Sequence, residues 1–121
     1  MAVKSVLLVS HGSRSAKTKQ EVMALAADLK KQSGIPIFEH AFLEIESPSI
    51  PEGIDECVLK GASQVTVLLN FLNSGRHVND DIPRIVEQAR QKYPRLKFSI
   101  TAPVGQHARI NGLFLDLIKH D

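Results

Sequence analysis

Histidine and glutamate are the residues of this chain with the widest chemical use, and two of the histidines have similar surroundings in the sequence. His11 follows the apolar run 3–10. His77 follows a second such run, 64–72, after a short polar stretch, and Glu44 ends another extended segment. Imidazole nitrogens together with a carboxylate suit borderline divalent ions such as Fe²⁺, Co²⁺, Ni²⁺ or Zn²⁺. A neutral imidazole can also accept a proton near pH 7. These three residues are therefore candidates for metal binding and proton transfer.

The strands that must position these residues follow from hydrophobic patterning. Segments 3–10 and 64–72 are near-continuous β-branched and apolar runs, which indicates central strands covered by helices on both faces. Segment 35–44 contains Pro36, and segment 96–101 alternates apolar and polar residues, so we expect these two strands at the sheet edges.

Amphipathic segments with helical spacing follow each of the strands. We expect Gly34 to cap the end of the first helix, and Pro94 to stop the third. Ser49 and Glu52 predict a capping box for the second helix, with Pro51 in its first turn. The apolar positions at helical spacing are Val22, Leu25, Ala26 and Leu29, then Ile82, Ile85, Val86 and Ala89, and finally Ile110, Leu113, Phe114, Leu117 and Ile118.

Four strand–helix units joined by right-handed crossovers predict the α/β fold class, with a three-layer architecture. The expected sheet has four parallel strands in the order 2-1-3-4 and is flanked by helices. Ligands of such sheets bind beyond the carboxyl ends of the strands, where neighbouring connections leave to opposite faces. Here that crevice lies between the first and third strands, so His11 and His77 are expected to face it.

Composition limits the classes of protein that remain. With 121 residues, 43% hydrophobic and 23% charged, we expect one domain over 1–121. A net charge of +2, dispersed along the chain, argues against a nucleic-acid partner. The chain has no apolar run near the roughly 18 residues of a membrane span and no leader-like start, so we expect a cytoplasmic protein without a membrane partner. Cys57, the single cysteine, is expected to pack in the core.

Four motifs together resemble the CbiX-type sirohydrochlorin cobaltochelatases and their ferrochelatase relatives. They are VSHGSR at 9–14, AFLEIESPS at 41–49, FLNSGRHVNDDIP at 71–83 and APVGQHARI at 102–110. The resemblance covers nearly the whole chain. It implies a chelatase-like half-domain that forms a homodimer, each chain corresponding to half of a longer, internally duplicated class II chelatase. The implied activity is that of a lyase-type chelatase that inserts a divalent metal into sirohydrochlorin, in cobalamin or sirohaem biosynthesis.

The resemblance also implies roles for particular residues. His11 and His77 would be the metal-handling and catalytic pair, and Glu44 matches the family's acidic position after the second strand. Sirohydrochlorin is a polycarboxylate, so the guanidinium groups of Arg14 and Arg76 are candidates for binding it. Co²⁺ is the expected ion, with Fe²⁺ or Ni²⁺ as alternatives, and the ion is a substrate rather than a permanent cofactor. Supporting contacts to the substrate are expected from Ser10, Gly12, Ser13 and Gly75.

Several alternatives stay open at this point. A metal or tetrapyrrole carrier would use the same pocket without turnover. A phosphate or flavin binder is supported by fold analogy alone. A histidine phosphatase would be expected to have an arginine directly before the histidine, but in this chain Ser10 precedes His11. The sequence also leaves open the choice of metal, the dimer interface, and the roles of Glu46 and His107, the latter of which has helix capping as its alternative role.

Overall fold

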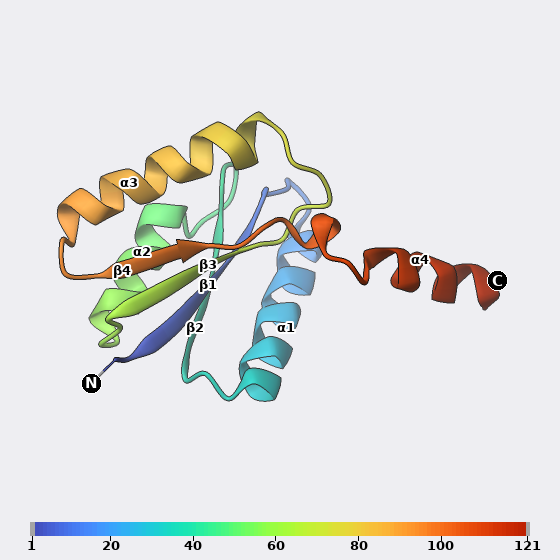
Figure 1. Ribbon diagram of the computed structural model, residues 1–121, viewed down its shortest axis with the longest axis horizontal. Coiled ribbons are helices and arrows are strands. Elements are labelled where there is room, and N and C mark those ends of the chain that lie inside the picture. Colours follow the sequence, from blue (N-terminus) through green and yellow to red (C-terminus); the bar gives the residue numbers. More distant parts are fainter. Residues whose placement is uncertain (1, 121) are drawn as a thin grey trace.

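The chain forms a twisted parallel sheet with helices on both faces, and its last helix stands away from the body (Figure 1). The structure is a computed structural model that describes residues 2–120, apart from the side chain of His77. The sheet order is β2-β1-β3-β4, with all pairs parallel, which confirms the predicted fold class and strand order. The elements are β1 Lys4–Ser10, α1 Ala16–Ser33, β2 Ile37–Phe42, α2 Ile50–Leu59, β3 Gln64–Leu69, the π-helical turn η1 His77–Asp81, α3 Ile82–Lys92, β4 Lys97–Ile100, the 3₁₀ turn η2 Val104–Gln106 and α4 Ile110–Lys119.

Two hydrophobic clusters lie on opposite faces of the sheet. The larger cluster joins α2 and α3 to one face, and its central side chains include Leu7, Ile54, Cys57, Val67 and Ile82. The smaller cluster joins α1 to the other face, through Val6, Leu8, Val22, Ala26, Phe38 and Phe42. Because alternate residues of a strand point to opposite faces, β1 contributes to both clusters and is the most deeply buried strand.

The local signals for helix ends are confirmed. Gly34 adopts a left-handed φ of 71° after α1 and donates its N–H to Lys30 O. Ser49 and Glu52 form the capping box of α2 with Pro51 in the first turn. α3 ends at Lys92, shortly before Pro94.

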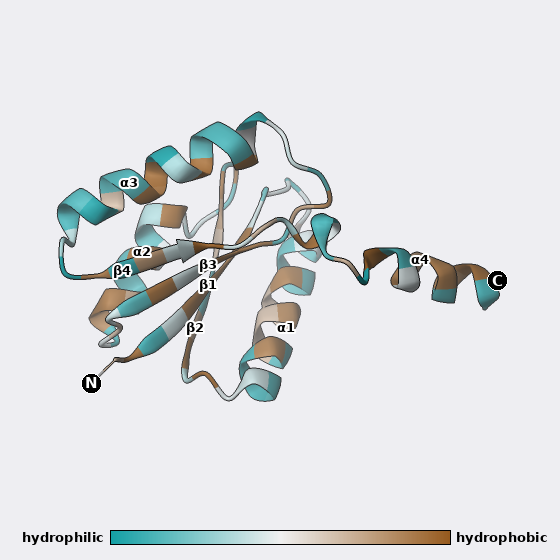
Figure 2. Cartoon of the chain, viewed as in Figure 1, coloured by the Kyte–Doolittle hydropathy of each residue, from teal (hydrophilic) through white to brown (hydrophobic). Residues whose placement is uncertain are grey.

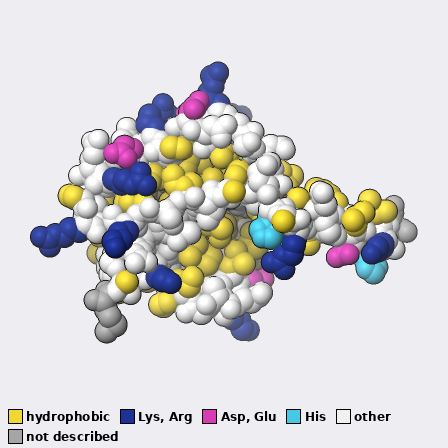
Figure 3. Space-filling model, in the orientation of Figure 1, with side chains coloured by type: hydrophobic (Ala, Val, Ile, Leu, Met, Phe, Trp, Pro, Cys, Tyr) yellow, Lys and Arg dark blue, Asp and Glu magenta, His cyan; other side chains and the backbone are white. Residues whose placement is uncertain are grey.

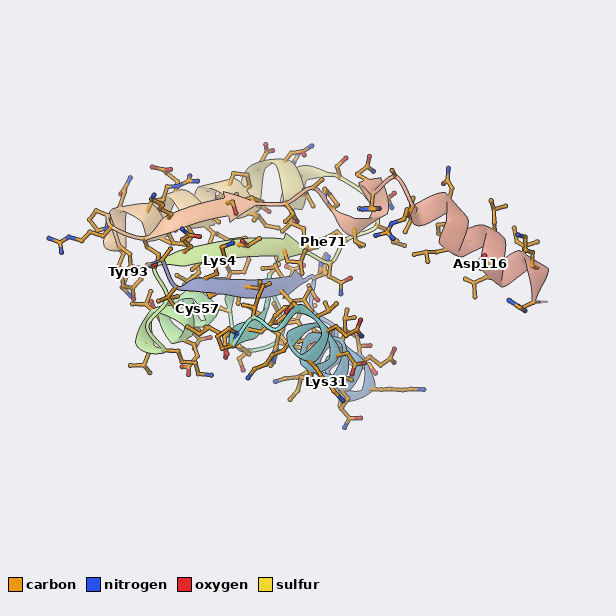
Figure 4. The ribbon with its side chains drawn as sticks, turned by 60° about the horizontal axis from the view of Figure 1, so that its bottom comes forward. Lys4, Lys31, Cys57, Phe71, Tyr93 and Asp116 are labelled. Atoms are coloured by element: carbon orange, nitrogen blue, oxygen red, sulfur yellow. The ribbon has the colours of Figure 1, made fainter. Side chains whose placement is uncertain are left out.

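One prediction about coverage is wrong, and the position of α4 explains it. The third strand was expected to be covered on both faces, but Val65, Val67 and Leu69 of β3 are buried whereas Thr66 and Leu68 are half-buried. Helix α4 forms at the expected apolar spacing, yet none of its residues, all of which the structure describes, is buried. The cause is that α4 points away from the sheet instead of lying beside α1 (Figures 1 and 4).

Within residues 2–120, none of the helices combines the length and the apolar character that crossing a bilayer requires.

Candidate active site

His11 and Glu44 form the centre of the site, at the carboxyl ends of β1 and β2. The His11 Nε2 atom lies 2.6 Å from Glu44 Oε1, and both side chains are about half-exposed, at 48% and 50%. Backbone bonds extend the strand pairing to this point, since the N–H groups of Leu43 and Glu44 donate to Ser10 O and His11 O. The structure thus brings two of the predicted residues into direct contact at the edge where ligands of parallel sheets bind.

A strained turn at Ile45 places the acidic residues on either side of it. Ile45 has a φ of 72°, and the Glu46 N–H donates to Glu44 O across 2.8 Å, which makes a γ-turn. A β-branched residue with this φ costs about 1–3 kcal/mol, and the Ile45 side chain, 59% exposed, gains little packing in return. The turn allows Glu44 to bond His11 while Glu46 Oε1 accepts from the Ser13 N–H at 2.7 Å.

Gly12 is required by the close approach of two loops. Its φ is 108°, and a Cβ at this position would lie 1.9 Å from Glu44 O. Both the backbone conformation and the contact therefore exclude a side chain. Gly12 lets the chain after His11 pass directly against the loop that carries Glu44.

Ser10 and Asn70 tie the ends of β1 and β3 together. The Asn70 side-chain amide donates to Ser10 Oγ at 3.1 Å, and the Asn70 N–H donates to Val9 O. Ser10 is buried, and its hydroxyl is bonded to Asn70 instead of being exposed to solvent. This arrangement favours a positioning role for Ser10 on the residue that follows it, His11.

A hollow of about 290 Å³, with both polar and apolar lining, opens beside His11. The irregular segment after β3 forms most of its wall, and Phe71 lies with its ring centroid 6.4 Å from that of His11. Figure 4 shows Phe71 at the end of β3 where the chain leaves the sheet. Gly105 fixes this wall from the other side, because its N–H donates to Phe71 O and a Cβ there would lie 1.7 Å from Leu72 O. The lining residues are His11, Phe71, Leu72, Asn73, Ser74, Gly75 and Val78.

The segment around His77 borders the same hollow. His77 begins the π-helical turn η1, and the Asn79 N–H donates to Gly75 O at 2.8 Å. π-helical turns are rare in proteins overall, but those that occur are often at functional sites. The prediction that the His77 imidazole binds metal lies outside the described residues. Among the side chains that are described, no three His, Cys, Asp or Glu residues gather closely enough to hold an ion.

The basic residues near the site differ in their hydrogen bonds. Arg14 and Arg76 are exposed. His107 Nδ1 accepts from the Arg109 N–H at 3.0 Å just before α4, which favours the capping role for His107. Ser13 Oγ accepts a hydrogen bond from the Ser15 N–H. The hydroxyl proton of Ser13 can therefore still be donated to a ligand.

Sequence reasoning missed Asn70, Phe71 and Ile45, which shape this site, and left the role of Glu46 open. Asn70 carried a signal, because it is a polar side chain directly after a buried strand and next to Ser10 in register. Phe71 and Glu46 lay inside the recognised motifs, but their contacts with His11 and Ser13 depend on other strands. Nothing in the sequence marks Ile45 as a residue with positive φ.

The fold and the site define a parallel α/β domain with a half-exposed imidazole–carboxylate pair at the carboxyl edge of its sheet. The sequence profile of the CbiX family matches residues 5–121, and the chain belongs to this family. The chain is 34% identical to the chloroplastic sirohydrochlorin ferrochelatase of Arabidopsis thaliana over 95% of its own length and 51% of that protein. It is 32% identical to the sirohydrochlorin cobaltochelatase of Sulfolobus acidocaldarius, over 94% of its own length and 85% of that protein.

A solved relative has the same fold. The structure of the sirohydrochlorin chelatase SirB from Bacillus subtilis subspecies spizizenii in complex with cobalt matches with a TM-score of 0.90 and 31% identity. The match covers 99% of this chain and 51% of the SirB chain. The chain thus spans about half the length of SirB and of the Arabidopsis protein.

Proposed function

We propose that this protein is a chelatase that inserts a divalent metal ion into sirohydrochlorin. The observation that carries the proposal is the His11–Glu44 pair, with its 2.6 Å contact, beside a hollow at the carboxyl edge of the sheet. The names of the relatives, which are sirohydrochlorin ferrochelatases and cobaltochelatases, support the choice of substrate.

The metal ion is a substrate, so the site must bind it weakly enough to release it. One imidazole and one carboxylate, both half-exposed, suit this requirement because they leave coordination positions open and allow exchange with solvent. A closed cage of four protein ligands would hold the ion too firmly. We assign His77 as a further ligand from its place in the motif, next to the same hollow.

The second task is to remove protons from the pyrrole nitrogens as the metal enters. If the Nε2–H of neutral His11 donates to Glu44, the lone pair of the ring is on Nδ1. A carboxylate that accepts from an imidazole fixes the tautomer and the orientation of the ring. His11 is thereby suited to accept a proton, with Glu44 as the group that orients it.

The polycarboxylate rim of the substrate needs cationic and N–H partners. We assign this role to Arg14 and Arg76, which are exposed on the two loops that bracket the hollow. The Ser13 hydroxyl is a further donor. Gly75 lines the hollow, and a Cβ built there would meet no atom within 4 Å, so the residue leaves room for the edge of a large ring.

We further propose that the protein acts as a homodimer, because a half-length chain offers one such edge while SirB has about twice the chain. Co²⁺ is the expected ion, ahead of Fe²⁺ and Ni²⁺. The cytoplasmic location stays a prediction from the sequence.

The test is an anaerobic insertion assay with purified protein, sirohydrochlorin and Co²⁺, Fe²⁺ or Ni²⁺ in turn, followed through the absorption of the macrocycle against a protein-free control. We expect several turnovers with at least one ion. The variant His11→Ala should lower the rate by roughly 10²-fold, the usual contribution of a general base, whereas His120→Ala, after the end of α4, should leave it unchanged. A spectral change that stops at one equivalent would identify a carrier and overturn the proposal.

A further inference from the structure

Glu46 lies in the loop between β2 and α2 and takes no part in the steps assigned to His11 and Glu44. Its Oε1 atom accepts the Ser13 N–H at 2.7 Å, in a part-buried contact. Among the described side chains no three His, Cys, Asp or Glu residues lie close enough together to hold an ion, so Glu46 does not complete a three-ligand set with His11 and Glu44. Figure 3 shows acidic side chains lying apart from one another on the face in view. The contact that the structure gives the Glu46 carboxylate is thus with the backbone after β1.

This contact continues the pairing of two loops beyond the ends of their strands. The loop 43–49 follows β2, and its Glu44 N–H donates to His11 O at 3.1 Å, which extends the backbone pairing of β2 with β1. After the γ-turn, a side chain takes the place of the backbone, because Glu46 Oε1 accepts the Ser13 N–H. Figure 2 shows the colouring change from hydrophobic to hydrophilic as the chain leaves β2 for this loop. Glu46 thus fastens the loop at the point where backbone pairing stops.

The same contact holds the strained part of the loop. Ile45, directly before Glu46, has a φ of 72° and an exposed side chain, so its own packing does not keep it in this conformation. Backbone strain of this kind persists only where surrounding contacts fix the chain. Two charge-assisted hydrogen bonds fix it on the side of the turn that leads to α2, one from the Ser13 N–H to Glu46 and one from Lys19 Nζ to Ser47 O at 2.7 Å. The bond to Glu46 is the one next to the strained residue.

We propose that Glu46 is a positioning residue that keeps Glu44 directed at the His11 ring. By accepting the Ser13 N–H, it holds the turn between the two glutamates in its strained conformation. Without this contact, Ile45 can relax to an ordinary φ, which changes the direction in which the Glu44 carboxylate points. The inference rests on the proposed function for its effect on metal insertion, whereas the hydrogen bond itself can be tested without the reaction.

The first experiment compares Glu46→Ala and Glu46→Gln in the anaerobic insertion assay. Accepting an N–H requires an oxygen atom, which Gln retains, whereas binding a metal ion as a carboxylate requires the charge. We expect Glu46→Ala to lower kcat by roughly tenfold, through a displaced Glu44, and to leave KM for sirohydrochlorin within about twofold. Glu46→Gln should recover most of kcat, and Glu21→Ala, at an exposed position of α1, is the control that should not change it. Equal losses in the two Glu46 variants would overturn the proposal.

The second experiment asks whether Glu46 acts through Glu44. In a Glu44→Ala background no carboxylate is left to position, so adding Glu46→Ala should lower kcat by less than about twofold further. A further loss of roughly tenfold would show that the two residues act independently, which contradicts the proposal. Circular dichroism and urea unfolding check that each variant is folded, because a protein that is merely destabilised would lose activity in both backgrounds alike.

The third measurement follows the Ser13 amide by NMR in the metal-free protein and does not depend on turnover. A hydrogen bond to a carboxylate is short and deshields the amide proton, so the Ser13 resonance should move upfield in Glu46→Ala and stay near its place in Glu46→Gln. A resonance that does not move in Glu46→Ala would remove the contact on which the proposal stands. An unchanged protein that does not insert metal would overturn the proposed function, whereas an active protein whose rate survives Glu46→Ala would overturn only the positioning role.

Discussion

At the scale of single residues, the site depends on backbone positions that hold two acidic side chains against the loop after β1. Ile45 takes an unfavourable φ, and the two glutamates beside it reach His11 Nε2 and the Ser13 N–H. Strain of this kind persists when the surrounding contacts compensate for it, and it concentrates at functional sites. The conformation of the γ-turn at Ile45 therefore helps to set the orientation of the His11 ring, through Glu44.

Replacing Glu44 with Gln should separate this orienting role from stability. The amide can still contact His11 but does not stabilise the imidazolium, so we expect the insertion rate to fall by roughly tenfold or more. The unfolding free energy should change by less than about 1 kcal/mol, because the contact between the two side chains is half-exposed. The measurements are the insertion rate and urea unfolding, with Glu87→Gln on α3 as the control. An unchanged rate for Glu44→Gln would remove this residue from the mechanism.

Substitution of Gly12 should show how closely the loops must approach. Gly12→Ala adds a Cβ into the space of Glu44 O at a φ of 108°, and we expect a loss of about 3 kcal/mol or a displaced loop. Gly61→Ala is the matched control, since Gly61 has a φ of 99° but no atom within 4 Å of an added Cβ. It should cost about 1 kcal/mol for the backbone alone. Equal losses in urea unfolding would show that the contact with Glu44 contributes nothing.

At the scale of elements, the features that the sequence predicts correctly are those with local causes. The cap at Gly34, the capping box of Ser49 and the sheet order follow from neighbouring residues, apolar runs and the handedness of crossovers. The placement of His11 and Glu44 at the same edge of the sheet was expected, because parallel strands bring their carboxyl ends together, but their direct hydrogen bond was not. The direction of α4 and the Glu46–Ser13 bond were not, since they depend on how distant loops pack. Periodicity shows that α4 has an apolar face but not which surface covers it.

Helices α2 and α3 are joined by a polar contact that should make stability depend on pH. The Tyr93 hydroxyl donates to Asp55 Oδ1 at 2.5 Å, and Lys92 Nζ lies 3.1 Å away. The hydrogen bond from Tyr93, followed by the effect of Lys92, holds the pKa of Asp55 below its ordinary 3.8 in the folded protein. The folded state therefore binds this proton more weakly than the unfolded state does. The stability from this group is complete above about pH 4–5 and is lost as the pH falls through the lowered pKa.

The variant Asp55→Asn should remove that dependence. At pH 7 we expect it to lose less than about 1 kcal/mol, because the contact is at the surface. The difference in unfolding free energy between this variant and the unchanged protein should then disappear as the pH falls to 3 and below. Urea unfolding between pH 2 and 7 measures this, with Tyr93→Phe as a second variant that removes the main donor. A gap that stays constant over this range would show that Asp55 has the same pKa in both states.

At the scale of the whole molecule, the two faces of the sheet are unequal. The α2–α3 face holds the larger cluster and the most deeply buried side chains, among them Cys57, Ile82 and Val86. The other face is covered by α1 alone among the described helices, and α4 projects from the body with no buried residue. Stability on the first face belongs to the single chain, and the proposed homodimer would add contacts between two copies. Unfolding should therefore respond to protein concentration.

Cys57 offers a direct measure of this link. Burial raises the pKa of its thiol to about 11, and the side chain is fully buried, so at pH 8 only about one thiol in a thousand would be ionised. A thiol reagent should then label Cys57 only when the larger cluster opens. If the proposed homodimer stabilises the folded state, labelling should slow as protein concentration rises, because mass action favours the form that opens least. A rate that does not change with concentration would mean that association of two copies adds nothing to the stability of the folded chain.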